Sequence, residues 1–440
     1  MKLKDKKVDN ISIIIITSIL FYLLILEANL IGNFAVIILL LPIALHPKIS
    51  FKLGRMEKYL MVYIIYGFIL TIIRYKQVYN LKNAFNLLFE YIIVFVACHF
   101  VKNYDWSTIV KWLRNFGLLL CGFGIGEGVF KFPILHYWLT GSYATQTYGT
   151  DSFRICLIFG RPILCGTMLL FLWGALYCKP FKNSIINFLA HGIFILNILM
   201  NKSRSCWIAF ALMVVLIVCK KCRKCRVRLK YFKILLMLFV LVAMLEILGI
   251  DAVGKIYNSV ADRIKGSLEA GTGQIVRIEN MISSFNYWFK EENYLDFLIG
   301  GGKNYSITFM NAHPVYKGNW KWEGVMDNQY LSIIHDFGIV GFVIFFGIVI
   351  VAMERFIKCT SYDVFSIYAN TTLLGLSICI FFYEGLNYPL IFWAIFMTIE
   401  MSDFAEQKGL ICKNVNSEMN CIASGDKINI LEDMSEENKA

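Results

Sequence analysis

Charged side chains are scarce in this sequence, where Asp, Glu, Lys and Arg make up 17% of the 440 residues. A soluble domain carries about a quarter, so the composition excludes a soluble globular protein. Apolar runs with few or no charges occupy residues 11–26, 84–101, 155–178 and 234–250. Runs near twenty residues suffice for a helix to cross about 30 Å of hydrocarbon, whereas the strands of a membrane barrel alternate apolar and polar residues. The sequence therefore predicts an all-α polytopic membrane protein.

Basic residues are missing from every second short loop, as in residues 27–29 and 384–389, while the loops of the other phase are rich in them. The first residues include Lys2, Lys4, Lys6 and Lys7, and residues 220–233 contain eight Lys or Arg. This positive-inside bias predicts a cytoplasmic N-terminus. The net charge of +12 is spread over these loops and not over a soluble domain, so no nucleic-acid partner is expected. The first apolar run also lacks a small-residue cleavage site, so no cleaved signal peptide is expected.

The apolar runs define twelve expected spans and therefore place both termini in the cytoplasm. The spans are residues 11–28, 30–45, 59–73, 84–101, 112–130, 155–178, 184–200, 205–219, 234–250, 331–352, 365–383 and 389–401. We expect four regions: spans one to nine in residues 1–250, a large extracytoplasmic cap loop in 251–330, spans ten to twelve in 331–401, and a disordered polar cytoplasmic tail in 402–440. A second, shorter outer loop covers residues 131–154.

Cysteine is absent from residues 251–327, which makes a disulfide framework in the cap improbable. Cys219, Cys222 and Cys225 form a CxxCxxC run, but a fourth nearby ligand is missing from the sequence, so no metal or other cofactor is expected. Four alternate glycines at residues 122–128 lie in an apolar span without a preceding strand. They predict close helix packing in place of a nucleotide-binding turn.

Four arginines fall at the outer rim of the expected spans or in the cap. Arg204 lies in Ser203-Arg204-Ser205-Cys206-Trp207, and Arg154 and Arg161 flank the start of the sixth span. Their separation of seven residues is two helical turns, which predicts that both project from one helix face. Arg277 lies on an amphipathic helix expected at residues 274–289, with Gly300-Gly301-Gly302 marking a turn beyond it. Guanidinium groups suit bidentate phosphate binding, so these positions point to a pyrophosphate-linked lipid substrate. Snorkelling to lipid headgroups is the alternative for Arg204, and simple solvation is the alternative for Arg277.

The segment Asp327-Asn328-Gln329-Tyr330-Leu331 lies where the cap returns to the tenth span, and Gly338 and Gly341 follow it. Asp327 is suited to act as a general base, although an N-cap of the following helix would also explain an aspartate there. His313 and His335 remain alternative bases. Aromatic residues of the cap are candidates for stacking on sugar rings, with cap packing as the alternative: Tyr305, Tyr316, Trp320 and Trp322.

These motifs, in this order and on this side of the membrane, resemble the O-antigen ligase and Wzy-type polysaccharide polymerase superfamily over about residues 154–389. The resemblance implies transfer of a glycan from undecaprenyl pyrophosphate to an acceptor hydroxyl on the outer face of the cytoplasmic membrane, without a required metal. It implies that Arg204 and Arg277 bind the donor pyrophosphate, with Arg154 as a further candidate.

One departure from the superfamily pattern concerns the reaction. Ligases that transfer to lipid A core usually begin the later segment with His, and this sequence has Asp327. The Asp-Asn-x-Tyr form favours a polymerase of lipid-linked oligosaccharide repeats for a capsule, exopolysaccharide or O-antigen. We expect Asp327, Arg277 and Arg204 to be catalytic, and Arg154, Arg161, Tyr330, His313, Trp320 and Trp322 to bind substrate. The expected partners are the undecaprenyl-pyrophosphate-linked oligosaccharide, the lipid bilayer and a chain-length regulator protein. The alternatives are a ligase of the same superfamily and a transporter or flippase of lipid-linked sugars, which usually shows two related halves and substrate groups at the bilayer midplane.

Overall fold

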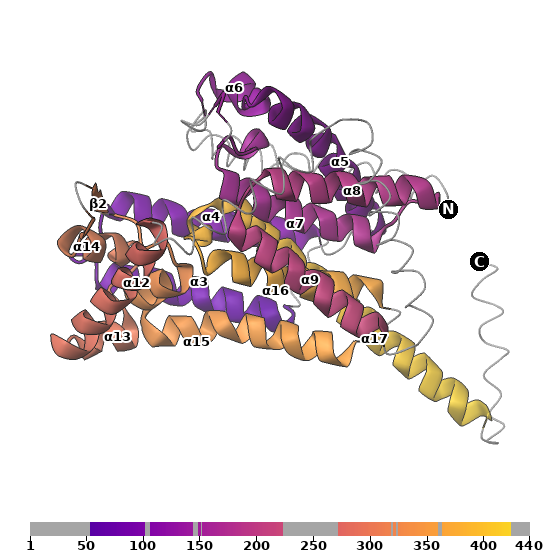
Figure 1. Ribbon diagram of the computed structural model, residues 1–440. Coiled ribbons are helices and arrows are strands. Elements are labelled where there is room, and N and C mark those ends of the chain that lie inside the picture. Colours follow the sequence, from indigo (N-terminus) through magenta and orange to yellow (C-terminus); the bar gives the residue numbers. More distant parts are fainter. Residues whose placement is uncertain are drawn as a thin grey trace.

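A computed structural model describes residues 53–101, 106–143, 148–150, 152–222, 272–317, 320–322, 324–359 and 363–423. Long helices form an elongated bundle, and short helices cluster as a cap at one end of it (Figure 1). The bundle helices are α3 (Arg55–Ile73), α4 (Leu81–Val101), α5 (Trp106–Phe130), α7 (Pro162–Cys178), α8 (Ser184–Met200), α9 (Arg204–Cys222), α15 (Gln329–Lys358), α16 (Val364–Ile380) and α17 (Pro389–Ala423).

These helices coincide with nine of the expected spans; the spans at residues 11–28, 30–45 and 234–250 lie outside the described residues. Within the described part, α3, α4, α5 and α15 are long and apolar enough to cross a membrane, while α7, α8 and α16 are shorter apolar helices. The helical multi-pass character is thereby supported. The total of twelve crossings and the side on which each loop lies stay predictions.

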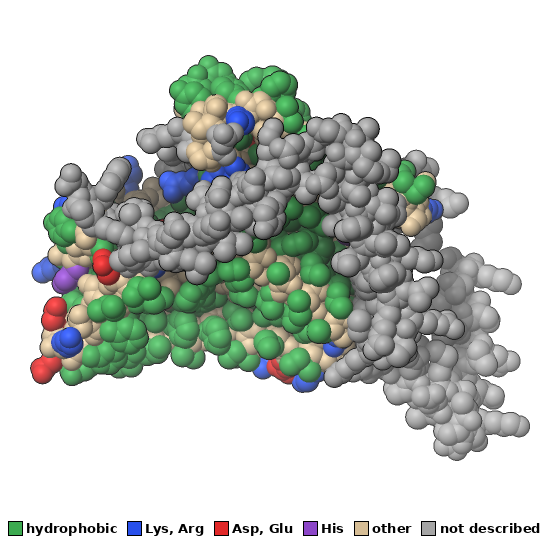
Figure 2. Space-filling model, viewed as in Figure 1, with side chains coloured by type: hydrophobic (Ala, Val, Ile, Leu, Met, Phe, Trp, Pro, Cys, Tyr) green, Lys and Arg blue, Asp and Glu red, His purple; other side chains and the backbone are tan. Residues whose placement is uncertain are grey.

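The outer surface of the bundle is apolar, as in a protein whose solvent is lipid. Ile65 and Ile69 on α3, and Val343 and Ile350 on α15, are exposed, whereas the first part of α17, from Leu390 to Asp403, is buried among the other helices. Figure 2 shows hydrophobic side chains covering the lower flank, with charged side chains gathered towards its two ends. An apolar band between two charged rims is the arrangement that a membrane-spanning bundle requires.

Two glycines of α5 allow it to approach α8 closely. A Cβ atom at Gly124 would lie 2.0 Å from Asn197 Oδ1, and one at Gly128 would lie 1.6 Å from Met200 Cε. Gly122 and Gly126 face more open space. The expected helix packing is therefore confirmed, and it rests on the i, i+4 pair.

The sixth span begins later than expected, at Pro162. The preceding chain contains a 3-10 turn, η1 (Leu157–Phe159), and Arg161 has the extended backbone usual before a proline (φ −125°, ψ 129°). The prediction that Arg154 and Arg161 share one helix face is therefore wrong. The Glu127 carboxylate on α5 holds this non-helical segment by accepting hydrogen bonds from the amides of Cys156 (3.3 Å) and Leu157 (2.9 Å).

The last helix ends later than expected, because α17 continues through Ala423. Ser402 and Asp403 are buried, and Asp403 Oδ1 lies 2.6 Å from the guanidinium of Arg355 on α15. The expectation of a disordered chain directly after residue 401 is therefore wrong as far as Ala423, and residues 424–440 lie outside the described part.

The cap contains α12 (Thr272–Phe285), the π-helical turn η3 (Asn286–Lys290), α13 (Tyr294–Ile299), α14 (Tyr305–Ala312) and a hairpin of β1 (Val315–Lys317) and β2 (Trp320–Trp322). The predicted cap helix at residues 274–289 is confirmed, while the small hairpin was not anticipated. The cap has its own hydrophobic core, separate from that of the bundle, formed by Trp288, Phe309, Met310, Met326 and Leu331.

A glycine contact locks the cap to the bundle. Gly338 kinks α15 with φ 67° and ψ −175°, which leaves carbonyl groups of the preceding turn without helical partners. The amides of Gly301 and Gly302 donate to the carbonyls of His335 (2.9 Å) and Asp336 (2.8 Å). A Cβ atom at Gly300 would lie 2.5 Å from the Asp336 carbonyl oxygen, so only glycine permits this approach. The expected turn at residues 300–302 is confirmed, and its amides bind backbone carbonyls.

Candidate functional site

The residues that follow Asp327 each hold the start of α15 in place. Asn328 is the N-cap, and its side chain accepts from the amides of Tyr330 (3.0 Å) and Leu331 (3.2 Å). The Gln329 side chain accepts from the amide of Leu386 (2.7 Å), and the Tyr330 hydroxyl donates to the carbonyl of Ser377 on α16 (2.9 Å). Asn328, Gln329 and Tyr330 therefore have structural roles, and the interpretation of Asp327 as the helix N-cap is wrong.

Asp327 itself adopts a left-handed backbone conformation, with φ 55°. Such a conformation costs free energy for any residue with a side chain, although Asp and Asn tolerate it best. It turns the chain out of the cap immediately before the N-cap. Strain of this kind is often found where a side chain must be held in one orientation for function.

Asp327 faces Arg277 of α12, although fifty positions separate them in the sequence. The Nη2 atom of Arg277 lies 4.0 Å from Oδ2 of Asp327, and both side chains are partly accessible. Burial raises the pKa of the Asp327 carboxyl above its ordinary value, and the positive charge of Arg277 opposes that rise. Arg277 Nε is buried without a hydrogen-bond partner among the described residues. The pair thus combines a carboxylate suited to accept a proton with a guanidinium that retains a donor for an anion.

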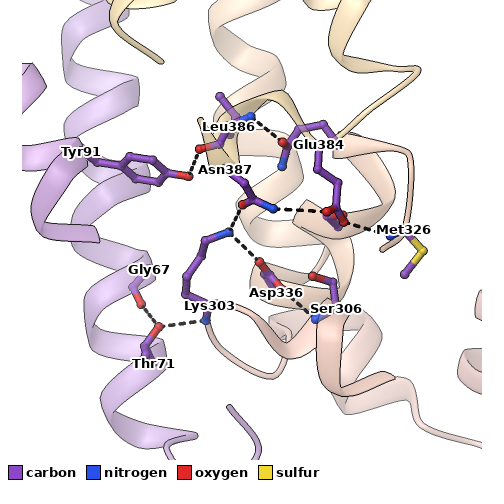
Figure 3. A network of polar contacts seen from close by, with 12 residues as sticks. Gly67, Thr71, Tyr91, Lys303, Ser306, Met326, Asp336, Glu384, Leu386 and Asn387 are labelled. Atoms are coloured by element: carbon purple, nitrogen blue, oxygen red, sulfur yellow. Dashed lines mark hydrogen bonds and ion pairs between the residues drawn. The ribbon is translucent and has the colours of Figure 1, made fainter. Parts of the chain in front are cut away.

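A buried polar network supports this pair (Figure 3). Lys303, which follows the glycine turn, is 2% exposed, and its Nζ atom donates to Asn387 Oδ1 (2.8 Å) and Asp336 Oδ2 (3.2 Å). The other carboxylate oxygen of Asp336 accepts from the amide of Ser306 on α14 (2.8 Å). The backbone amide of Lys303 donates to the hydroxyl of Thr71 on α3 (2.9 Å). One lysine therefore joins the cap to α3, α15 and the connection before α17.

Glu384 is the second acidic residue of this network and was not identified from the sequence. Its Oε1 atom accepts from the Ser332 hydroxyl (2.5 Å) and the Met326 amide (3.2 Å), and its Oε2 accepts from Asn387 Nδ2 (3.2 Å). Burial raises the pKa of this carboxyl, and the Ser332 hydrogen bond and the charge of Lys303 lower it. The bond to Met326 fixes the residue directly before Asp327. The available signal was a lone glutamate in the short connection between two apolar helices.

Arg154 and Arg204 lie at the turn between α8 and α9. Arg154 Nε donates to the carbonyl of Asn201 (3.1 Å), and Arg204 is the first residue of α9, three positions after Asn201. Asn201 also donates from its side chain to the carbonyl of Ile155 (3.0 Å). Arg154 and Arg204 are therefore brought to the same turn, and both are half-buried.

Arg161 is exposed and reaches the loop between α16 and α17. It donates to the hydroxyl of Tyr388, and its guanidinium carbon lies 5.2 Å from the centre of that ring. The same loop contains the 3-10 turn η4 (Gly385–Asn387) as well as Glu384. It therefore contacts Arg161 on one side and the Lys303 network and Met326 on the other.

The two candidate histidines differ in accessibility. His335 is fully buried, its Nε2 lies 2.9 Å from the Ser284 hydroxyl, and its ring stacks on Phe309 with 4.2 Å between centroids. This placement makes His335 a link between α15 and α12 that an acceptor sugar does not reach. His313 is half-buried and stacks on Phe309 from the end of α14, so it keeps partial access.

The aromatic candidates also differ in accessibility. Tyr330 packs between α15 and α16 through the bond to Ser377 described above. The Tyr305 hydroxyl donates to Asp296 Oδ2 (3.0 Å) inside the cap, in agreement with cap packing. Tyr316 is exposed on the hairpin. Trp320 and Trp322 belong to β2, and their side chains lie outside the described part.

One group of the described residues has metal-ligating side chains within 4.8 Å of one another: Glu57, His99 and Glu400. His99 Nδ1 lies 2.7 Å from Glu57 Oε1 and 3.8 Å from Glu400 Oε1, so a protonated imidazole would form ion pairs with both carboxylates. Glu57 is in the first turn of α3, whereas Thr71 near the other end contacts the cap. The group is therefore far from Asp327. Of the CxxCxxC run, Cys219 is exposed on α9, and Cys225 lies outside the described residues.

A comparison with known protein families finds a match to part of the chain. The family model for O-antigen ligase matches residues 189–346, which include Arg204, Arg277 and Asp327 but not Arg154, Arg161 or Glu384. A comparison with curated proteins finds no match. The matched segment runs from α8 through α9 and the cap into α15 and thus contains the Arg277–Asp327 pair. Residues 189–346 of the chain are thus similar to the O-antigen ligase family, in agreement with the resemblance seen in the sequence motifs.

Proposed function

We propose that this protein is a glycosyltransferase that polymerises lipid-linked oligosaccharide repeat units into a surface polysaccharide. The donor is an oligosaccharide on undecaprenyl pyrophosphate, and transfer takes place on the outer face of the cytoplasmic membrane. The observation that carries the proposal is the Arg277–Asp327 pair, in which a carboxylate on a left-handed residue faces a guanidinium with a free donor atom.

The reaction assigns a role to each of these groups. Asp327 accepts the proton of the acceptor sugar hydroxyl, and the hydroxyl oxygen attacks the anomeric carbon of the donor chain. The bond from that carbon to the pyrophosphate oxygen breaks, and the electron pair leaves with the undecaprenyl pyrophosphate. Arg277 and Arg204 balance the charge that develops on the leaving group, with Arg154 beside Arg204. Because pyrophosphate is already a good leaving group, positioning and charge stabilisation are the main tasks of the protein.

One feature favours a polymerase over a ligase, namely that Asp327 stands where ligases usually have His. Asn328, Gln329 and Tyr330 hold the start of the helix that follows this aspartate. The ligase of the same family remains the second candidate, because the matching family model describes O-antigen ligase. A ligase would attach finished polymer to a different acceptor and would not lengthen lipid-linked chains.

The test uses purified protein in lipid with lipid-linked repeat units as both donor and acceptor. We expect products that contain two or more repeats. We expect Asp327→Asn to abolish them, and Arg277→Ala and Arg204→Ala to stop long chains from appearing while leaving a slow residual transfer. Asn tolerates the left-handed conformation at residue 327, so loss of activity there reports the charge and not the backbone. Glu292→Gln and Lys290→Ala, on exposed cap residues, are the matched controls and should keep wild-type activity. Normal chain length in all three site variants would refute the assignment of the site. Transfer to a non-polymer acceptor without chain growth would identify the ligase.

A further inference from the structure

The cap helix α12 turns its apolar stripe outward. The side of α12 and η3 that packs into the cap is formed by Asn280, Ser284 and Trp288, all of which are buried. The opposite side carries four large apolar side chains that are 43–57% exposed, namely Ile278, Ile282, Phe285 and Phe289. An amphipathic helix in water has the reverse orientation, with its apolar stripe on the core. This stripe must therefore face something other than water.

The exposed stripe continues onto the next helix and from there onto the bundle. Tyr294, Leu295 and Leu298 of α13 are 51–58% exposed. α13 packs on α15 at the kink, where the Gly338 backbone lies against Leu298 and Ile299. Beyond the kink, Val340 and Val343 of α15 are exposed in turn, on a helix long and apolar enough to span a membrane. Figure 2 shows hydrophobic side chains running from the cap into the lower flank along α15. The apolar surface of the cap is thus continuous with the surface that faces lipid.

Charged residues mark the edge of this surface. Lys290, Glu291 and Glu292 are exposed at the turn between η3 and α13, and Arg277 lies on α12 one position before Ile278. Apolar side chains on one face with charges along the border are typical of helices that lie in the membrane–water interface. Tyr294, at the charged end of α13, is of the type enriched at that depth.

We propose that α12, η3 and α13 are inserted into the outer leaflet, with the stripe from Ile278 to Leu298 in contact with the acyl chains of bilayer phospholipids. The cap is then anchored in the interface and does not stand above it in water. Arg277, on the same helix, is held at the depth of lipid phosphate groups. This is the depth at which the pyrophosphate of a membrane-anchored donor lies. The insertion itself depends on the chain being a membrane protein and not on the polymerase activity.

Photo-crosslinking tests this contact without using sugar chemistry. The photoreactive residue p-benzoylphenylalanine replaces Phe285 in the full chain, which is reconstituted in nanodiscs of phosphatidylethanolamine and phosphatidylglycerol without polyprenyl lipids. We expect intact-mass spectrometry after irradiation to show protein carrying the mass of one phospholipid. The same replacement at Tyr316, exposed on the cap hairpin, and at Phe309, buried in the cap core, provides the controls. Their phospholipid adducts should be at least fivefold less abundant.

Equal phospholipid adducts at positions 285 and 316 would overturn the proposal, as would crosslinks from position 285 mainly to a second copy of the chain. Each variant is also assayed for polymerisation. Lipid adducts at position 285 in a protein that makes no polymer would support the membrane contact and count against the proposed function. Polymerisation without adducts would do the opposite.

Discussion

Replacing Lys303 by Met tests whether the buried network holds the cap in place. Met keeps the length and the apolar stem of the side chain but removes the ammonium group. Asp336 then remains buried at 2% exposure, with the Ser306 amide still bound but its cationic partner lost. Removing one partner of a buried ion pair typically costs about 3–5 kcal/mol, because the remaining charge is uncompensated. The free energy of unfolding should fall by about that amount.

Thermal unfolding in detergent, followed with a thiol-reactive fluorophore, measures this loss. Most cysteines of the described part are buried and become reactive only on unfolding: Cys98, Cys121, Cys156, Cys165, Cys178, Cys206 and Cys379. The expected cost corresponds to a decrease in the apparent unfolding temperature of about 5–10 °C. Scan rates are kept equal for all variants because unfolding of such proteins is often irreversible.

The double variant Lys303→Met/Asp336→Asn makes the reasoning refutable. Removing both charges should recover at least about 2 kcal/mol relative to the sum of the single variants, since the two groups are in direct contact. The control is Lys290→Met, the same substitution at an exposed lysine of the cap, which should leave the unfolding temperature unchanged. A Lys303→Met protein that unfolds at the wild-type temperature would show that the pair does not hold the cap. Strict additivity in the double variant would show the same.

Three further outcomes follow from the geometry. Asp327 must be deprotonated to act as a base, and burial raises its pKa, so the polymerisation rate should fall as the pH drops through a pKa above that of an ordinary aspartate. Arg277→Gln removes a charge that lowers this pKa, so it should move the acid limb of the rate profile to higher pH. An unmoved limb would contradict the pairing. Gly338→Ala places a Cβ atom 2.3 Å from the Leu298 carbonyl oxygen, at a residue with positive φ. The same thermal assay should show that the free energy of unfolding falls by about 3 kcal/mol or more. Gly122→Ala, where the added Cβ atom faces open space, is the control that should be unaffected. Burial raises the pKa of Glu384, so folding favours its protonated form. Its contribution to stability is lost as the pH rises from the ordinary glutamate pKa through the pKa in the folded protein. The unfolding temperature of Glu384→Gln should therefore decline less with rising pH than that of wild type, and parallel curves would contradict the raised pKa of Glu384.

The sequence was most informative about the spans, because a membrane helix satisfies its backbone hydrogen bonds within itself and shows its apolar face in its composition. Nine expected spans coincide with helices, and the glycines at residues 122–128 predicted close helix packing, which Gly124 and Gly128 make against α8. Its errors at the ends of spans have local causes. Pro162 delays the start of α7, and burial of Ser402 and Asp403 against α15 carries α17 past the last apolar residues. Hydropathy does not register either effect.

Individual site residues were recognisable from the sequence, and their roles were not. Asp327 and Arg277 were both expected, but an aspartate before a helix is also the signature of an N-cap. Only the placement of Asn328 in that role separated the two interpretations. His335 was an alternative base, but its ring on α15 is buried against α12 and α14. Accessibility depends on which elements pack around a side chain, and that information is not local.

The sequence by itself determined that the chain is rich in apolar helices of membrane-spanning length, and it singled out four arginines and an aspartate as candidate site residues. Composition and helical periodicity are properties of short segments. Only the tertiary structure decided that Arg277 meets Asp327, and that Lys303, Asp336 and Glu384 form a network with residues from several distant segments. It also decided that the apolar stripe of α12 faces outward. The physical reason is the same in each case. Contacts between segments distant in sequence decide which charges pair and which helix faces are buried. The free energy of these contacts depends on both segments, so it cannot be inferred from either one alone.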